Sequence, residues 1–145
     1  MKASQAAIDL IKRFESLRLE AYLCPAGVRT IGWGHTTEVQ PGQKISLARA
    51  EELLRHDVEQ VEDVLACVLR VPVTQGEFDA LVSLCFNLRG GAHRLPRIAP
   101  KLLAKLEAGD RFGASIELLD INRANGQRLA GLTRRREAER ALFVG

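Results

Sequence analysis

The sequence predicts an α+β fold in which helices predominate and a small β-hairpin lobe lies beside a helical bundle. Apolar residues recur at helical spacing along most of the chain, while the stretch 17–35 alternates with period two. The length of 145 residues suits one compact domain and excludes a multidomain protein. We therefore predict a single domain over 1–145, with a helix and the hairpin lobe in 1–45 and a helical lobe in 46–145.

The N-terminal elements are a short helix followed by the hairpin. Ser4 is suited to cap the helix, which ends near Glu15. Its apolar stripe consists of Ala7, Ile8, Ile11 and Phe14. Residues 25–27, Pro-Ala-Gly, supply the turn between the two strands. The return strand, expected over 29–35, contains two glycines, which indicate a bulge or the close approach of another group.

A long helix is predicted after Ser46, followed by a second helix that begins after Thr74. The long helix should present its apolar residues to the core and turn its polar residues to solvent, namely Glu52, Arg55, Glu59, Glu62 and Asp63. Thr74 and Glu77 have the spacing of a capping box. Three shorter helices are expected at about 97–108, at about 111–122 after Asp110, and at about 134–143 after Thr133.

Charge is distributed unevenly along the chain, which carries 21 Lys and Arg against 18 Asp and Glu, net +3. Residues 1–88 hold 9 basic and 12 acidic side chains, net −3, whereas 89–145 hold 12 and 6, net +6. The basic part favours an anionic partner: nucleic acid, anionic lipid or an acidic cell-wall polymer. A nucleic-acid module would interleave aromatic residues with basic ones. Because only Phe112 and Phe143 occur there, we expect no nucleic-acid partner.

The cysteines and the apolar runs bear on cofactors and location. Cys24, Cys67 and Cys85 are an odd, sparse set without metal-ligand spacing, so neither a disulfide framework nor a metal site is expected. We expect Cys67 and Cys85 to be core residues and foresee no cofactor. No apolar run is long enough to span a bilayer, and residues 1–9 do not resemble a secretory signal, so synthesis and retention in a cytoplasm are expected.

Three residues around the hairpin are candidates for chemistry: Glu15, Cys24 and Thr30. A carboxyl at a helix-to-strand junction, beside apolar neighbours and facing a glycine-rich strand, can serve as a general acid. Taken on residue type alone, the alternatives are a surface glutamate, a structural thiol and an ordinary strand threonine.

Two stretches of the hairpin region resemble a known family. Residues 13–22, Arg-Phe-Glu-Ser-Leu-Arg-Leu-Glu-Ala-Tyr, and 30–36, Thr-Ile-Gly-Trp-Gly-His-Thr, are similar to the bacteriophage-type lysozymes, the endolysin muramidases of glycoside hydrolase family 24. The family signature of a Glu, an Asp or Cys, and a Thr at fixed spacing falls on Glu15, Cys24 and Thr30. The resemblance continues through 74–87, 108–110 and 131–137, and so covers nearly the whole chain.

The resemblance implies hydrolysis of the β-1,4 bond between N-acetylmuramic acid and N-acetylglucosamine of peptidoglycan, in a cleft between the two lobes. Glu15 would protonate the glycosidic oxygen. Cys24 stands where the family usually has Asp, and would act as base or nucleophile. Thr30 would hold the attacking water or the covalently engaged sugar. The resemblance also assigns binding or supporting roles, without a metal, to His35, Gly32, Asn87 and Arg135, with Arg135 set against Glu15.

Some positions depart from the family pattern. The loop 87–97 carries Arg89, Arg94 and Arg97 where neutral residues are usual, and Ile121 replaces a common aromatic. The alternative is thus a catalytically weak or inactive relative that only binds peptidoglycan. Whether the enzyme inverts or retains configuration stays open at this point. The resemblance further implies a monomer, held in the host cytoplasm and released to the periplasm or cell wall at lysis.

Overall fold

A computed structural model describes residues 1–88 and 90–145, so Arg89 of the divergent loop lies outside the described residues. The described elements are α1 (Gln5–Phe14), β1 (Arg18–Leu23), β2 (Arg29–Gly32), α2 (Leu47–Val68), α3 (Gln75–Asn87), the 3₁₀ turn η1 (Ala92–Arg94), α4 (Leu95–Ile98), α5 (Pro100–Glu107), α6 (Arg111–Glu117), the 3₁₀ turn η2 (Leu118–Asp120), β3 (Arg123–Ala124), β4 (Gln127–Arg128) and α7 (Ala130–Val144). The helix-dominated α+β class is confirmed.

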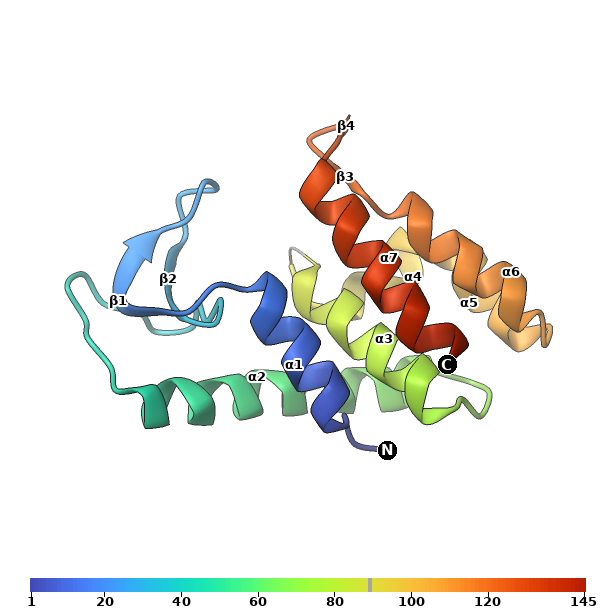
Figure 1. Cartoon of the computed structure of the whole chain (residues 1–145), viewed down its shortest axis with the longest axis horizontal. Coiled ribbons are helices and arrows are strands. Elements are labelled where there is room, and N and C mark those ends of the chain that lie inside the picture. The colour runs from blue at the N-terminus through green and yellow to red at the C-terminus, as the bar shows by residue number, and fades with distance from the viewer. Residues whose placement is uncertain (89) are drawn as a thin grey trace.

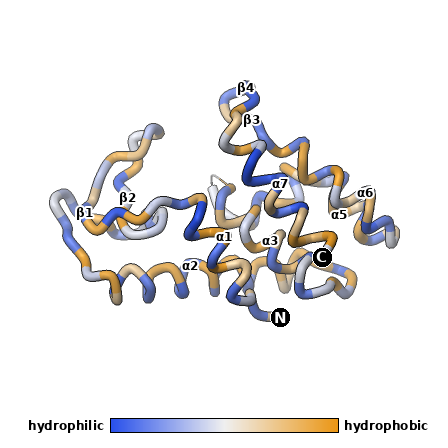
Figure 2. The backbone as a smooth tube through the Cα atoms, in the orientation of Figure 1, coloured by the Kyte–Doolittle hydropathy of each residue, from blue (hydrophilic) through white to orange (hydrophobic). Residues whose placement is uncertain are grey.

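The long helix α2 connects the two sides of the molecule (Figure 1). The β1–β2 hairpin lies near its N-terminal end, while α3 to α7 gather over its C-terminal part. α3 is the central helix of the body, since it packs against α1, α2 and α7. Apolar and polar residues alternate along the α2 tube in Figure 2, as expected for a helix with one buried face. Its buried apolar side chains include Leu54, Val58 and Leu65.

The N-terminal helix and hairpin form as predicted, with two differences in the strands. Ser4 caps α1 by accepting a hydrogen bond from the Ala6 amide. β1 and β2 pair antiparallel with a register irregularity between Arg18 and Tyr22, so the extra residues lie in β1 and not in the glycine-containing return strand where a bulge was one of the two expectations. β2 ends at Gly32 instead of running to residue 35. Gly32 has φ +64°, a left-handed conformation that breaks the strand and turns the chain back.

The caps of α2 and α3 are those expected, but one residue of the predicted solvent face is buried. Ser46 accepts from the Arg49 amide, and Thr74 and Glu77 form the capping box. Glu62 is only 6% exposed, which contradicts the prediction. The N-terminal segment folds over it: Lys2 Nζ and the Ala3 amide donate to its two carboxylate oxygens at 2.8 and 2.7 Å. Periodicity within a helix could not anticipate this contact.

Several C-terminal elements differ from the prediction; the helix expected at 111–122, for example, is α6 followed by the 3₁₀ turn η2. The helix expected at 97–108 is two helices, α4 and α5, because Pro100 has no amide hydrogen and cannot continue the first one. α7 begins at Ala130, so Thr133 lies inside it and does not cap it; its hydroxyl donates to the Leu129 carbonyl instead. The short β3–β4 ladder was not predicted. Asn125 and Gly126, both at positive φ, form its turn.

The cysteines are placed less uniformly than expected. Cys85 is buried, but Cys67 is exposed, so the prediction that both lie in the core is wrong for Cys67. Cys67 lies two positions beyond the buried Leu65 and therefore on the opposite side of α2. No disulfide joins the three cysteines, all of which belong to the described part of the chain. Within residues 1–88 and 90–145, no helix is long and apolar enough to cross a membrane.

Candidate active site

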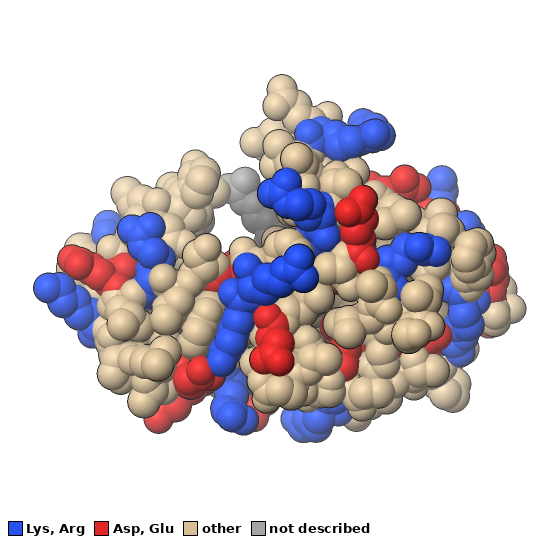
Figure 3. Space-filling model, in the orientation of Figure 1, with Lys and Arg blue, Asp and Glu red and all other residues tan. Residues whose placement is uncertain are grey.

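A cleft of about 620 Å³ separates the hairpin from the helical body. In the face drawn in Figure 3, basic side chains gather along this hollow. The end of α1, the hairpin, α2 and α3 all contribute to its walls. Its polar lining residues include Glu15, Thr30, Thr36, Thr37, Asp57, Gln60, Asn87 and His93, and its apolar ones include Phe86, Val61 and Val64. Such a mixture suits a sugar chain, whose rings have apolar faces and polar edges.

Glu15 lines the cleft directly after α1. Its side chain is 22% exposed. Arg135 Nη1 donates to Glu15 Oε1 at 2.7 Å. The other oxygen, Oε2, lies against Gly34, where a Cβ atom would sit 3.0 Å from it. One carboxylate oxygen is therefore held by a cation, and the second lies beside Gly34, which also lines the cleft.

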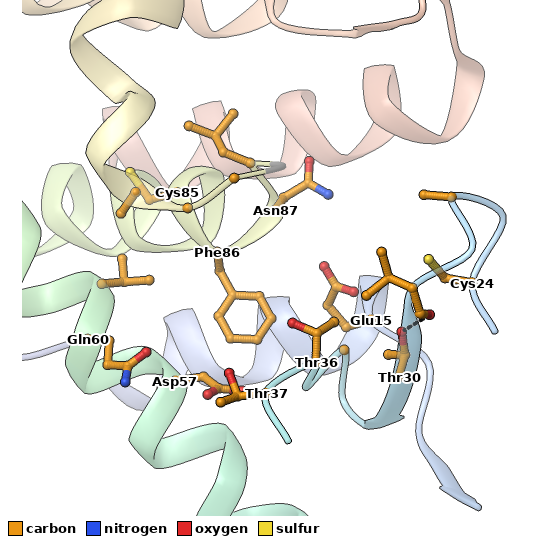
Figure 4. Close-up of a pocket in the computed structure, with 18 of the residues that line it drawn as sticks. Glu15, Cys24, Thr30, Thr36, Thr37, Asp57, Gln60, Cys85, Phe86 and Asn87 are labelled. Atoms are coloured by element: carbon orange, nitrogen blue, oxygen red, sulfur yellow. Dashed lines mark hydrogen bonds between the residues drawn. The ribbon is translucent and has the colours of Figure 1, made fainter. Parts of the chain in front are cut away.

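Cys24 and Thr30 approach the same cleft from the hairpin (Figure 4). Cys24 is half-buried at the end of β1, where the turn is closed by its amide donating to the Val28 carbonyl at 2.9 Å. Thr30 is buried, and its hydroxyl donates to the Val28 carbonyl at 3.0 Å. Because this hydrogen is already used, the Thr30 oxygen can act only as an acceptor toward a water or a sugar hydroxyl.

His35 and Gly32 support the walls and do not line the cleft. His35 Nδ1 lies 2.8 Å from Asp57 Oδ2, and Nε2 lies 2.9 Å from the Thr37 carbonyl. Its two partners do line the cleft, so His35 ties the segment after the hairpin to α2. Gly32 packs toward Ile45 and Ala50, away from the cleft lining. Asn87, at the end of α3, lines the cleft and accepts a hydrogen bond from Arg136 Nη2.

A second hollow of about 400 Å³ adjoins the first at Glu15 and Asn87, which line both. Its walls come from the end of α1 and the start of α7, with Arg13 and Arg134 at its edge. The Glu15 carboxyl thus lies at the border between the two hollows. The basic edge gives the second hollow an attraction for anionic groups.

The basic C-terminal part is less available to solvent than its charge count indicated. Arg135 and Arg136 are buried, and Arg111 pairs with Glu77 at 3.0 Å. Several of its arginines therefore bind carboxylates within the protein. The surface charge available to a partner is smaller than the net +6 of that part of the sequence.

Sequence reasoning missed three residues of the site. Gly34 touches the Glu15 carboxylate, Asp57 pairs with His35, and Glu139 contacts Arg135. Only Gly34 carried a signal, as one of two glycines predicted to mark a close approach. Asp57 and Glu139 are ordinary charged helix residues in the sequence, and their roles depend on which helices pack together.

A carboxyl that lines a cleft between two lobes is typical of glycoside hydrolases, in which one carboxyl group protonates the leaving oxygen. Comparison with known proteins agrees with this class. Residues 12–139 match the family model described as phage lysozyme. The chain therefore belongs to the phage lysozyme family, which confirms the resemblance seen in its sequence.

The relatives span the whole chain. The endolysin of Acyrthosiphon pisum secondary endosymbiont phage 1 is 44% identical over 99% of this chain and 98% of that protein. The endolysin of Salmonella phage P22 is 34% identical over 99% of both. The endolysin of Bacillus phage B103 is also 44% identical, although this chain spans only 54% of its length.

Solved structures show the same fold. The muramidase domain of SpmX from Asticaccaulis excentricus is 35% identical, with a TM-score of 0.88 over 99% of this chain and 98% of that one. The active form of P1 phage endolysin Lyz is 28% identical, with a TM-score of 0.88 over 99% and 85% of the two chains.

Proposed function

We propose that this protein is a phage or prophage endolysin that hydrolyses the β-1,4 bond between N-acetylmuramic acid and N-acetylglucosamine of peptidoglycan, and so lyses the host cell. The observation that carries the proposal is the Glu15 carboxyl, which lines the cleft and which Arg135 holds through one oxygen while the other lies beside Gly34. Membership of the phage lysozyme family supports the substrate class.

In the proposed reaction, Glu15 donates its proton to the glycosidic oxygen. The bond from that oxygen to C1 of N-acetylmuramic acid breaks, and positive charge develops on the departing sugar ring. The Arg135 guanidinium then stabilises the Glu15 carboxylate that remains. A water adds to C1 from the hairpin side and loses a proton there, which completes hydrolysis.

Thr30 and Cys24 are the groups proposed to handle that water. Thr30 can accept a hydrogen bond from it, because its own hydroxyl hydrogen is bound to Val28. Cys24 takes the proton when it is a thiolate. A water held by these residues attacks opposite the leaving oxygen, so the configuration at C1 is expected to invert.

The test is product analysis on purified cell walls. Hydrolysis gives muropeptides with a reducing N-acetylmuramic acid, of the α configuration if the reaction inverts. Some members of this family are transglycosylases, and these would release a 1,6-anhydro sugar instead. Products with the anhydro ring would contradict the proposed hydrolysis. Bound walls without release of products would favour the alternative of an inactive binding relative.

We further propose that the protein acts as a monomer, without a nucleic-acid partner. It would be made in the host cytoplasm and reach the cell wall at lysis. Size-exclusion chromatography with light scattering tests the oligomeric state. Fractionation of host cells before and after lysis tests the location.

A further inference from the structure

A buried group of charged side chains lies behind the active site, between α3 and α7. It consists of Ser83, Arg135, Arg136 and Glu139, and we call it the α3–α7 charge cluster. All four residues are buried, and Glu139 has no exposed surface. Glu139 lines neither hollow, so it cannot touch a substrate bound there. Burial of a charged carboxylate is costly unless it is well paired, so its position needs an explanation.

Glu139 is bound from three sides. Its Oε1 accepts from the Ser83 hydroxyl at 2.7 Å and from Arg135 Nε at 3.2 Å. Its Oε2 lies 3.1 Å from Arg136 Nη1. Burial raises the pKa of Glu139, and the Arg136 and Arg135 guanidinium groups oppose that effect. Two cations thus share one buried carboxylate.

The contacts of Arg135 indicate the role of the Glu139 carboxylate. Nε donates to Glu139 and Nη2 donates to the Ser83 carbonyl at 3.1 Å. A guanidinium is planar, so fixing these two nitrogens also fixes the direction of the third. That third nitrogen, Nη1, donates to Glu15 at 2.7 Å. Glu139 and the Ser83 carbonyl therefore set the direction in which Arg135 donates to Glu15.

We propose that Glu139 is a positioning residue for catalysis, which orients Arg135 toward Glu15 and offsets part of the positive charge that acts on Glu15. This inference rests on the proposed role of Glu15 as the acid. Without the negative charge of Glu139, the positive charges of Arg135 and Arg136 would be less offset at Glu15. The Glu15 carboxylate would be favoured, and the acid would lose its proton at a lower pH.

The other groups near the two carboxyls complete the electrostatic surroundings. Around Glu15 these include Cys24 from the hairpin and Arg13 from α1, and from α7 Arg134 and Arg136 besides Arg135. Around Glu139 the α3 side contributes Cys85 as well as Ser83. None of these groups is altered in the variants below, apart from Arg135 in the double variant.

Two substitutions of Glu139 separate orientation from charge. Glu139→Gln removes the charge, and should lower kcat on soluble peptidoglycan fragments about fivefold or more while moving the alkaline limb of the pH–rate profile about half a pH unit to lower pH. Glu139→Asp keeps the charge but is one methylene too short to hold Arg135 Nε. Glu139→Asp should therefore lower kcat without shifting the pH at which the alkaline limb of the profile falls. KM should stay within about twofold in both, because Glu139 does not contact substrate.

Controls exclude a general loss of packing. Glu77→Gln is a matched control, because Glu77 is also a buried carboxylate of α3 that binds an arginine, Arg111 of α6, and its bonds do not involve Arg135. It should leave kcat and the pH profile unchanged even if it lowers the melting temperature. In an Arg135→Gln background, Glu139→Gln should shift the limb much less than it does alone.

A carboxyl ¹³C NMR titration of Glu15 gives a readout that needs no turnover. The Glu15 resonance should titrate at lower pH in Glu139→Gln than in wild type and Glu139→Asp. Identical Glu15 titrations and pH–rate profiles in all three proteins would overturn the positioning role. A wild-type protein that releases no muropeptides would instead contradict the proposed function, while the titration would still test the Glu139 inference.

Discussion

Arg135 Nη1 and Glu15 Oε1 lie 2.7 Å apart and join the start of the hairpin to the last helix, across 120 positions of sequence. Arg135 is 3% exposed, so this pair forms in surroundings with little water, where an ion pair is stronger than at the surface. The contact fixes one oxygen of the carboxyl and leaves the other beside Gly34 in the cleft lining. Several measurable consequences depend on that arrangement.

Replacing Glu15 by Gln should reduce wall lysis by about a hundredfold or more, because an amide cannot donate the proton to the leaving oxygen. The measurement is turbidity loss of cells whose outer membrane has been stripped, together with thermal melting. The melting temperature should stay close to wild type, since the side chain is partly exposed and its shape is kept. Glu20→Gln, an exposed carboxyl on β1, is the control. Lysis by Glu15→Gln within a few-fold of wild type would remove Glu15 from the mechanism.

Gly34→Ala should lower activity through a steric contact with the acid. A Cβ at this position would lie 3.0 Å from Glu15 Oε2. Gly42→Ala is a matched control, because Gly42 also has a positive φ, +71° against +75°, but open space around it. Both variants should lose about 1 kcal/mol of stability from backbone strain. If Gly42→Ala loses as much kcat as Gly34→Ala, strain and not the carboxylate contact explains the loss.

Substitutions of Cys24 test the hairpin side of the reaction. Cys24→Asp should retain or improve lysis near neutral pH, because Asp is ionised there whereas an ordinary thiol, with a pKa of about 8.5, is not. Cys24→Ala and Cys24→Ser should lower the rate. If Cys24→Ala lyses cells at the wild-type rate, Cys24 has a structural role only, and Thr30 alone would hold the attacking water.

A thiol-blocking reagent gives an independent test of Cys24, provided the exposed Cys67 is first removed. In a Cys67→Ser background the reagent should reproduce the Cys24→Ala loss, and it should spare Cys24→Asp. Cys85 also lines the cleft but is only 1% exposed, so its thiol should react much more slowly than that of Cys24. Equal inactivation of the Cys24→Asp protein would place the sensitive thiol elsewhere.

Salt should weaken wall binding through the exposed arginines of the cleft. Reversing Arg13 and Arg134 to Glu should raise KM more than it lowers kcat and flatten the salt dependence, because these residues edge the hollow next to Glu15. Reversing Arg94 and Arg97, two arginines of the divergent loop, should have a smaller effect, since Arg94 is only partly exposed. An unchanged salt dependence in both double variants would contradict a role for these arginines in binding walls.

Alkaline pH should destabilise the fold through Cys85. Burial, with a smaller effect of Glu139, raises the pKa of Cys85 from 9.0 to about 12. From about pH 9 the unfolded chain loses this proton while the folded chain keeps it, so the free energy of unfolding falls as pH rises toward 12. Chemical denaturation between pH 8 and 11 should show a shallower decline in Cys85→Ala than in wild type. Cys67→Ala, at an exposed site, should decline as wild type does.

The sequence by itself determined most of the local elements and the position of Glu15, the candidate acid, at the end of α1. Helix caps at Ser4, Ser46 and Thr74 act within a few residues, so they can be recognised from the sequence and are found in the structure. The spaced Glu15, Cys24 and Thr30 lie close in sequence, which explains why a short motif predicted that they share a site. Their roles in the reaction stay predictions.

Only the tertiary structure decided which charged residues are buried and what they contact. Glu62 and Glu139 are helix residues with no local signal, yet both are bound in the interior by groups from distant segments. Arg135 and its neighbour Arg136 also look alike in sequence, and packing of α7 on α3 sends one to Glu15 and the other to Asn87. Periodicity reports the apolar face of one helix. The partners of a polar group depend on how several helices pack against one another, which local sequence does not encode.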